Sequence, residues 1–225
     1  MEIEPRLWAV VIVGPPGAGK DTQAGLLATE LGLVQLKTSE IIEEKFSASS
    51  PDDQIIQEQI KRKASGGLVE SSLVLQWFIE RLRKVHGEGK GIVASGSPRT
   101  LPEAEAEMPV LKELYKPEGV KIIYIKLSEE ESVKRNSFRR VCEKNSHPIP
   151  NFPEFNELVV CPQDGSPIIT RQDDTPETIS HRYRVYQEQT EPIVDFLSKE
   201  GYSVITINGE QPIESVHRDI LDKLW

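Results

Sequence analysis

The chain has 225 residues, and its hydrophobic content of 37% is enough to bury a core and to exclude a disordered or fibrous protein. A formal net charge of -9 argues against a nucleic-acid-binding protein and against one held at an anionic membrane, since both need basic surfaces. No apolar run approaches the roughly 20 residues that span a bilayer, no signal-peptide pattern precedes the first predicted strand, and two cysteines are too few for a disulfide scaffold, so we expect a cytoplasmic protein.

The first half of the chain alternates between buried strands and helices. Residues Leu7–Val13 form a nearly continuous apolar run typical of a buried parallel strand, and Lys20–Leu31 is predicted to be a helix. A short strand at Val34–Leu36 precedes Thr38–Gly67, a polar segment of helical pattern that ends on two glycines. The next predicted elements are a helix at Ser71–Val85 and a strand at Gly91–Ala94.

The second half continues this alternation and adds an insertion. A strand is predicted at Lys121–Leu127, a helix at Glu129–Arg140 and a late strand at Ser203–Ile207. Between them, Asn145–Thr175 is rich in proline and lacks a helical period. The alternation predicts an α/β fold with a doubly wound parallel sheet of about five strands, which binds ligands at the carboxyl ends of the strands. Two insertions on one sheet predict two flaps over one cleft.

A phosphate-binding loop is the most specific local motif. Gly14–Lys20 has the G-x-x-x-x-G-K spacing and lies between a predicted strand and a predicted helix, as a P-loop NTPase fold requires. Its glycines let backbone N–H groups converge on phosphate oxygens, and Lys20 can reach the β- and γ-phosphates. Asp21 stands where Ser or Thr is usual, so we expect this carboxylate to point away, to pair with a base or to contact Mg²⁺ through water. Thr22 is then the better candidate for a hydroxyl near Mg²⁺.

The run Gly14–Gln23 resembles the opening of adenylate kinases, whose loop is Gly-x-Pro-Gly-x-Gly-Lys-Gly-Thr-Gln. Three further segments resemble family segments in the same order: Leu36–Glu40 is similar to Thr-Gly-Asp, Gly67–Val69 to Gly-x-Leu-Val, and Ser95–Thr100 to Asp-Gly-Phe-Pro-Arg-Thr. The resemblance covers nearly the whole chain. It implies a P-loop core of residues 1–37, 68–138 and 176–225, a monophosphate-binding subdomain of residues 38–67, and a lid of residues 139–175.

The activity that the resemblance implies is the reversible, Mg²⁺-dependent transfer of a phosphoryl group from ATP to AMP, giving two ADP. The partners that it implies are small nucleotides. We also expect a monomer, because no coiled-coil heptad or long apolar patch is apparent, and the net charge argues against nucleic acid and membrane as partners. Two alternatives stay open. One is a kinase for another monophosphate, such as GMP or CMP, and the other is a nucleotide-binding regulatory protein with impaired turnover.

The resemblance also assigns candidate roles to individual residues. Arg99 would hold the acceptor phosphate, Arg171 and Arg182 would neutralise the transferring group, and Asp173 and Asp174 would orient arginines of the lid. The catalytic candidates are Lys20, Arg99, Arg135, Arg171 and Arg182. The candidates for ATP and Mg²⁺ are Gly17, Ala18, Gly19, Lys20, Asp21, Thr22, Arg135, Arg139 and Gln211. The acceptor candidates are Thr38, Glu43, Gly67, Leu68, Val69, Gly96, Ser97, Pro98, Arg99, Glu103, Arg171 and Arg182.

Three residues in the predicted acceptor site depart from the family pattern, in addition to Asp21 in the phosphate loop. Glu43 replaces an arginine that faces the AMP phosphate, Glu103 replaces a glutamine that contacts adenine, and Ser95 replaces an aspartate associated with hydrated Mg²⁺. Like charges at about 4 Å repel by about 4 kcal/mol at an intermediate dielectric, so Glu43 weakens acceptor binding unless a cation such as Arg62 or Lys63 compensates. An ionised Glu103 can accept from the adenine amino group but cannot donate, so guanine is conceivable as well. AMP remains the expected acceptor.

The inserted segment contains an incomplete zinc pattern. Cys142-x-x-Asn145 followed by Cys161-x-x-Asp164 resembles the zinc-binding version of the family's lid. Asn145 is a poor ligand, so a tetrahedral Zn²⁺ site would need His147 as its fourth ligand beside Cys142, Cys161 and Asp164. A metal-free lid is the alternative, and the incomplete pattern favours it.

Overall fold

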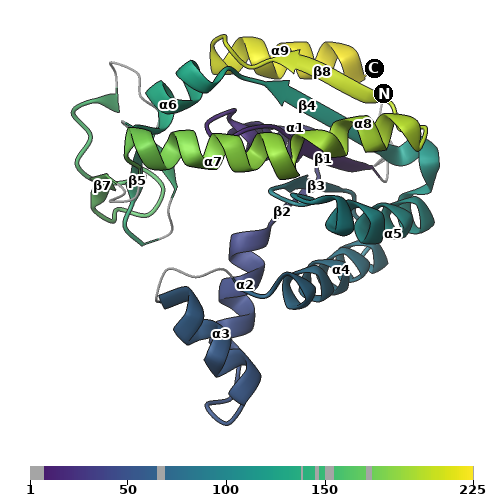
Figure 1. The fold of residues 1–225 in the computed structure, drawn as a ribbon, viewed down its shortest axis with the longest axis horizontal. Coiled ribbons are helices and arrows are strands. Elements are labelled where there is room, and N and C mark those ends of the chain that lie inside the picture. The colour runs from purple at the N-terminus through teal and green to yellow at the C-terminus, as the bar shows by residue number, and fades with distance from the viewer. Residues whose placement is uncertain are drawn as a thin grey trace.

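The computed structural model describes residues 8–64, 69–137, 139–144, 147–149, 155–170 and 174–224. Its centre is a parallel five-stranded sheet in the order β2-β3-β1-β4-β8 (Figure 1). The strands are β1 (Ala9–Val13), β2 (Val34–Lys37), β3 (Ile92–Ser95), β4 (Val120–Lys126) and β8 (Val204–Asn208). The predicted α/β fold with a doubly wound parallel sheet of about five strands is thereby confirmed.

The sheet is buried on both faces because its central strands are apolar at nearly every position. On β1, Ala9, Val11 and Val13 enter one core cluster while Val10 and Ile12 enter the other, as the alternation of side chains along a strand requires. Helices α4 (Ser71–Gly87), α5 (Leu101–Gly119) and α8 (Glu191–Lys199) contribute to the first cluster. Helices α1 (Lys20–Leu31) and α9 (Ile213–Leu224) contribute to the second.

Most of the predicted boundaries differ from the structure by one or two residues, and the end of one helix differs by more. The first strand begins at Ala9, and Leu7 lies outside the described residues. The helix predicted to run to Arg140 is wrong at its end, because α6 (Glu129–Ser137) stops earlier and Arg140 starts a strand. This strand is specified by its antiparallel partner about 28 residues further on, a long-range contact that local helical spacing does not reveal.

Helix α5 was not predicted from the sequence, and its prolines explain why. Pro109 and Pro117 lie inside it, and Lys116 has a non-helical φ of 60° that separates its last turn from the rest. Interior proline removes a hydrogen bond and normally marks the end of a helix. The helices α7 (Pro176–Gln189), α8 and α9 were not predicted either.

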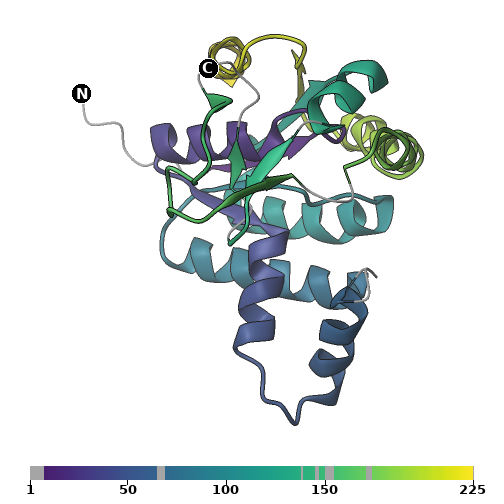
Figure 2. The same ribbon diagram turned by 90° about the vertical axis from the view of Figure 1, so that its left-hand side faces the viewer.

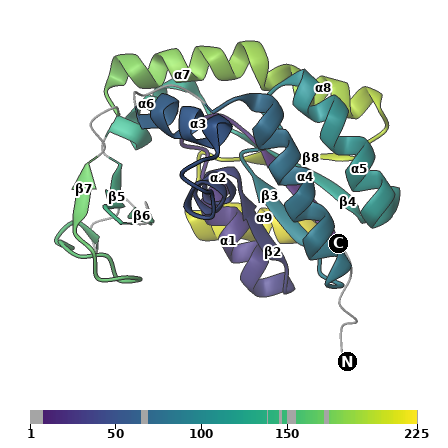
Figure 3. The ribbon, with the colours of Figure 1, turned by 90° about the horizontal axis from the view of Figure 1, so that it is seen from below.

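Two insertions interrupt the alternation of strands and helices. After β2 the chain forms α2 (Thr38–Ser47) and α3 (Gln54–Ala64), a helical hairpin that projects below the body in Figures 1 and 2. After α6 it forms a small antiparallel sheet of β5 (Arg140–Cys142), β6 (Pro148–Ile149) and β7 (Ile168–Thr170). Helix α7 then runs from this sheet along the body toward α8 (Figure 3).

The limits of the predicted subdomains, 38–67 and 139–175, remain predictions, since residues 65–68 and 171–173 lie outside the described part. Within the described residues, no helix combines the length and the apolar character that crossing a membrane requires.

Candidate active site

The phosphate loop between β1 and α1 has the backbone of an anion cradle. Gly17 and Gly19 adopt φ angles of 78° and 80°, a region that favours glycine. Gly19 is the N-cap of α1 and provides no side-chain cap, and a Cβ there would meet nothing within 4 Å. Ala18 within the loop is buried, and the space beside Gly19 at the uncapped N-terminus of α1 is open, so an anion has room there. The loop fits a bound triphosphate.

Lys20 lies at the centre of a group of cations. Its ammonium donates to the carbonyl oxygens of Gly14 and Pro15, at 2.8 Å each. Burial and then the charge of Arg99 lower the pKa of Lys20 to about 8, with a further lowering from Arg139 and an opposing effect of Asp21. Arg99 and Arg139 thus act on Lys20 from two different parts of the chain, and a polyanion between them would relieve their mutual repulsion.

Asp21 is held by a residue from another strand. Ser95 Oγ, at the carboxyl end of β3, donates to Asp21 Oδ1 at 2.7 Å, and Gln35 Nε2 donates to the Asp21 carbonyl at 3.1 Å. Two of the departures from the family pattern, Asp21 and Ser95, are therefore in direct contact. Thr22 follows in the first turn of α1.

Helix α6 supports the loop from the side. Ser132 Oγ donates to the Pro16 carbonyl at 2.7 Å, and Arg135 Nη2 donates to the Gly209 carbonyl at 2.9 Å. Ser132 and Asn136 are buried, and neither residue was among the candidates predicted from the sequence. Their helical spacing with Arg135 was the available signal, since positions 132, 135 and 136 share one helix face.

Gln211 lies two residues beyond Gly209, in the loop that follows β8. Its side-chain amide donates to Asp219 Oδ2 of α9 at 2.7 Å. Arg135 and Gln211 therefore belong to the same end of the sheet as the phosphate loop, although the Gln211 amide is directed to α9 in this structure.

A buried carboxylate joins two of the candidate arginines. Asp174, whose side chain is fully buried, accepts from Arg139 Nε and Nη2 at 2.9–3.1 Å and from Arg182 Nη1 at 3.2 Å. This geometry orients both guanidinium groups. Arg171 and Asp173 lie outside the described residues.

The loop that carries Arg99 is held at several points. Arg99 Nε donates to the Gly96 carbonyl at 2.8 Å, and the Arg99 N–H donates to Glu103 Oε2 at 2.7 Å. Thr190 Oγ1 donates to the Arg99 carbonyl at 2.7 Å. Ser97 and Pro98 are buried between these anchors. One Glu103 oxygen is consequently engaged by the backbone of Arg99.

The helical hairpin contributes Thr38 and Glu43. Thr38 begins α2, and its Oγ1 is buried with no hydrogen-bond partner among the described residues. Glu43 forms an ion pair with Lys63 of α3. Val69 is half-buried and packs against the first core cluster. Gly67 and Leu68 lie outside the described residues.

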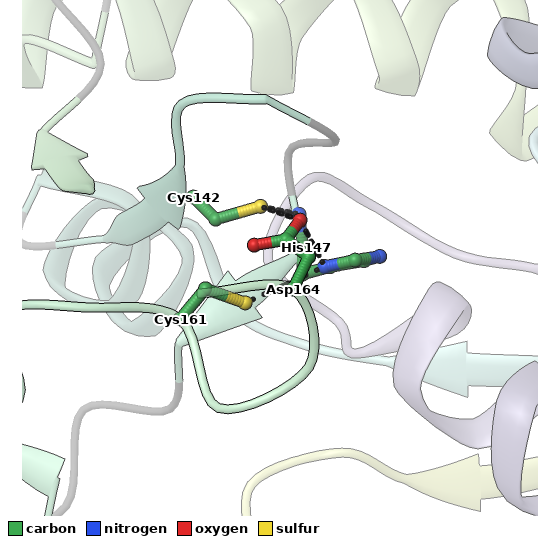
Figure 4. A group of neighbouring side chains, drawn as sticks. All are labelled: Cys142, His147, Cys161 and Asp164. Carbon is green, nitrogen blue, oxygen red and sulfur yellow. Dashed lines mark hydrogen bonds and ion pairs between the residues drawn. The ribbon is translucent and has the colours of Figure 1, made fainter. Parts of the chain in front are cut away.

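The four possible zinc ligands come together in the lid (Figure 4). The ligand atoms of Cys142, His147, Cys161 and Asp164 all lie within 4.8 Å of one another. Cys142 Sγ is 3.3 Å from Asp164 Oδ2, and His147 Nδ1 is 3.5 Å from Cys161 Sγ. Ser166 donates to the other Asp164 oxygen through its N–H and its hydroxyl, at 2.9 and 2.6 Å. Asn145 lies outside the described residues.

Comparison with known proteins gives a consistent result. The sequence profile of a family described as adenylate kinase matches residues 12–202. The chain is 35% identical to an adenylate kinase of Kosmotoga olearia over 96% of its own length and 98% of that protein. It is 35% identical to an adenylate kinase of Archaeoglobus fulgidus, over 94% of its own length and 95% of that protein. It is 32% identical to an adenylate kinase of Streptomyces avermitilis, over 96% of each of the two chains.

Proposed function

This chain belongs to the adenylate kinase family, and we propose that its site carries out the family's reversible transfer of a phosphoryl group from Mg-ATP to AMP. The protein is a phosphotransferase that acts on nucleotides. The observation that carries the proposal is the phosphate loop with its buried Lys20, whose pKa is lowered first by burial and then by the charges of Arg99 and Arg139. Phosphoryl transfer depends on positioning and on dispersed positive charge rather than on a covalent nucleophile.

On the donor side, the N–H groups of Gly17 to Lys20 would hold the phosphates of ATP. Lys20 would exchange its two loop carbonyls for phosphate oxygens, and Arg135 and Arg139 would add charge from α6 and from the start of the lid. When bound, Mg²⁺ would neutralise part of the phosphate charge, and Thr22 and Asp21 would be the residues of this chain that hold its coordination shell.

On the acceptor side, Arg99 would bind the AMP phosphate and Thr38 would use its unpartnered hydroxyl. The ion pair with Lys63 offsets the negative charge of Glu43, so the charge reversal there does not prevent monophosphate binding. Glu103 keeps one carboxylate oxygen beyond the one that accepts from Arg99, and that oxygen can accept from the adenine amino group.

The acceptor is tested by comparing nucleotides. Mg-ATP is incubated with the protein and with AMP, GMP, CMP or UMP at several concentrations, and ADP formation is followed. We expect kcat/KM to be highest for AMP and ADP formation to require an added monophosphate. A higher kcat/KM for GMP or CMP would overturn the choice of AMP, and ADP formed equally without an acceptor would overturn the kinase proposal.

We further propose that the lid binds a structural Zn²⁺ through Cys142, His147, Cys161 and Asp164. Two sulfur, one nitrogen and one oxygen ligand match the preference of Zn²⁺, and the short distances among the four atoms support a closed tetrahedral site. Ser166 fixes the Asp164 carboxylate as an outer partner, as is common for metal ligands.

Metal analysis of protein produced with zinc in the medium tests this site. We expect about one Zn²⁺ per chain, its loss in the Cys161→Ser variant, and a lower melting temperature after chelation. Protein that contains no zinc and melts at the same temperature with and without chelator would remove the proposal. We also propose that the protein is a cytoplasmic monomer. The cytoplasm keeps cysteines reduced, as zinc-binding thiolates require.

A further inference from the structure

Glu107 is a buried acid that the proposed chemistry does not use. It lies on the inner side of α5 with an exposed fraction of 1%. Its Oε1 accepts a hydrogen bond from the hydroxyl of Ser97, and its Oε2 is buried without a partner among the described residues. A buried carboxyl oxygen without a partner is costly, and an apolar side chain at this position would not carry that cost.

The partner of Glu107 belongs to the loop that presents Arg99. Helix α5 holds this loop at two places one turn apart, with Glu103 accepting from the Arg99 N–H and Glu107 accepting from Ser97. Thr190 holds the same loop from the other side by donating to the Arg99 carbonyl. Ser97 and Arg99 are two residues apart, so a displacement of Ser97 is transmitted directly to the arginine.

We propose that Glu107 is a positioning residue for acceptor binding, which fixes Ser97 and thereby the direction in which Arg99 extends toward the acceptor phosphate. This inference rests on the proposed function and extends it by one residue. Glu107 itself touches no substrate. Its effect is expected on the KM for AMP, because misplacing an arginine by about 1 Å weakens every contact that depends on its fork geometry.

The protonation state of Glu107 gives this role a pH signature. Burial raises the pKa of Glu107 to about 8, the hydrogen bond from Ser97 opposes the rise, and the negative charge of Glu103 adds to it. At neutral pH the group is therefore a neutral carboxylic acid. Above about pH 8 it ionises, and a buried charge without a cationic partner favours movement of the loop.

No charged group on the elements packed against α5 is among the causes of the pKa shift of Glu107. These elements are β1, α4, β4 and α8, and β1 has no ionisable side chain. The ionisable groups on the other three are Glu80, Arg81, Arg83, Lys84, His86, Lys121, Tyr124, Lys126, Glu191, Asp195 and Lys199. The charge that acts on Glu107 is that of Glu103, on α5 itself.

Three variants and the wild type separate positioning from a purely structural role. Glu107→Gln mimics the neutral acid, Glu107→Met removes the hydrogen bond to Ser97 with an apolar side chain of similar length, and Glu105→Gln changes an exposed acid on the same helix as a control. KM for AMP, KM for ATP and kcat are measured between about pH 6.5 and 9.5. Melting temperatures are recorded alongside.

The wild type should show a KM for AMP that rises by about tenfold above pH 8, the size of effect expected when an arginine–phosphate contact weakens. Glu107→Gln should lack this rise, and Glu105→Gln should keep it. Glu107→Met should have a KM for AMP raised by about tenfold at every pH although the protein melts higher. Lys20 also loses its proton at alkaline pH, which is expected to change the KM for ATP equally in the wild type and in every variant.

Two results would overturn the positioning role in an enzyme that is otherwise active. One is a wild-type KM for AMP in Glu107→Met. The other is a KM for AMP in Glu107→Gln that rises above pH 8 as it does in the wild type. A wild type that makes no ADP from ATP and AMP would overturn the proposed function, and this inference with it.

Discussion

At the scale of single residues, Lys20 shows how a binding site costs stability in the free protein. The pKa of Lys20 is lowered to about 8, first by burial, whereas an unfolded lysine titrates near 10.5. The folded state therefore binds fewer protons between these values. The destabilisation is fully present below pH 8 and fades as the pH rises toward 10.5.

Lys20→Met should remove this destabilisation and the activity together. At pH 7 we expect the nucleotide-free variant to gain about 1–3 kcal/mol in free energy of unfolding, with a smaller gain at pH 10, and to lose about 10²–10³-fold in kcat. Denaturant unfolding at the two pH values and steady-state kinetics measure both effects. A variant less stable than the wild type at pH 7 would contradict this account of Lys20.

Asp21 and Ser95 form the second residue-scale feature. Each departs from the family pattern, and the 2.7 Å hydrogen bond between them shows that the two positions face the same space. The sequence revealed both departures but could not show that they were in contact, because 74 residues separate them.

Asp21→Asn tests whether the carboxylate serves Mg²⁺. It keeps the size and a hydrogen-bond acceptor for Ser95 but removes the charge, so we expect about fivefold weaker apparent Mg²⁺ affinity of the nucleotide complex and an unchanged melting temperature. Binding of Mn²⁺ to the protein with a non-hydrolysable ATP analogue provides the measurement. Ser95→Ala retains the charge and should bind Mn²⁺ nearly as well as the wild type. Equal affinities of Asp21→Asn and the wild type would refute this role.

At the scale of elements, the lid shows how contacts between distant residues limit a prediction from sequence. The helix predicted through Arg140 ends early, and the pairing of β5 with β7 brings Cys142 to the second half of the insertion. Local spacing identified Cys142, Cys161 and Asp164 as candidates but favoured a metal-free lid. The proximity of His147 to the other three depends on this long-range pairing, which no short pattern encodes.

Asp174 couples the lid to α7, because it joins Arg139 before the lid sheet to Arg182 on the helix after it. Asp174→Asn keeps the shape but leaves the two arginines without a shared carboxylate. We expect kcat/KM for ATP to fall by at least about tenfold and the free energy of unfolding to fall by about 2 kcal/mol. Asp195→Asn, at an exposed acid of α8, is the matched control. If the two variants behave alike, the arginines do not depend on Asp174.

At the scale of the whole molecule, the fold followed from two strong sequence signals. The phosphate loop identified β1 and α1, and the apolar runs identified the parallel sheet. The proline-containing α5 and the polar contacts that cross the sheet, such as Ser132 with Pro16 and Ser97 with Glu107, were not predictable, because their partners are brought together only by the folded chain. The sequence thus predicted which residues belong to the candidate site, but not the hydrogen bonds that connect them.

As a whole molecule, this protein is expected to transfer one phosphoryl group from ATP to AMP. Phosphorus NMR of a mixture of Mg-ATP, AMP and protein measures this transfer directly, because all three nucleotides are followed at once. We predict that one ATP and one AMP disappear for every two ADP formed, and that chelation of Mg²⁺ stops the reaction. Loss of ATP with release of inorganic phosphate and no loss of AMP would contradict the claim.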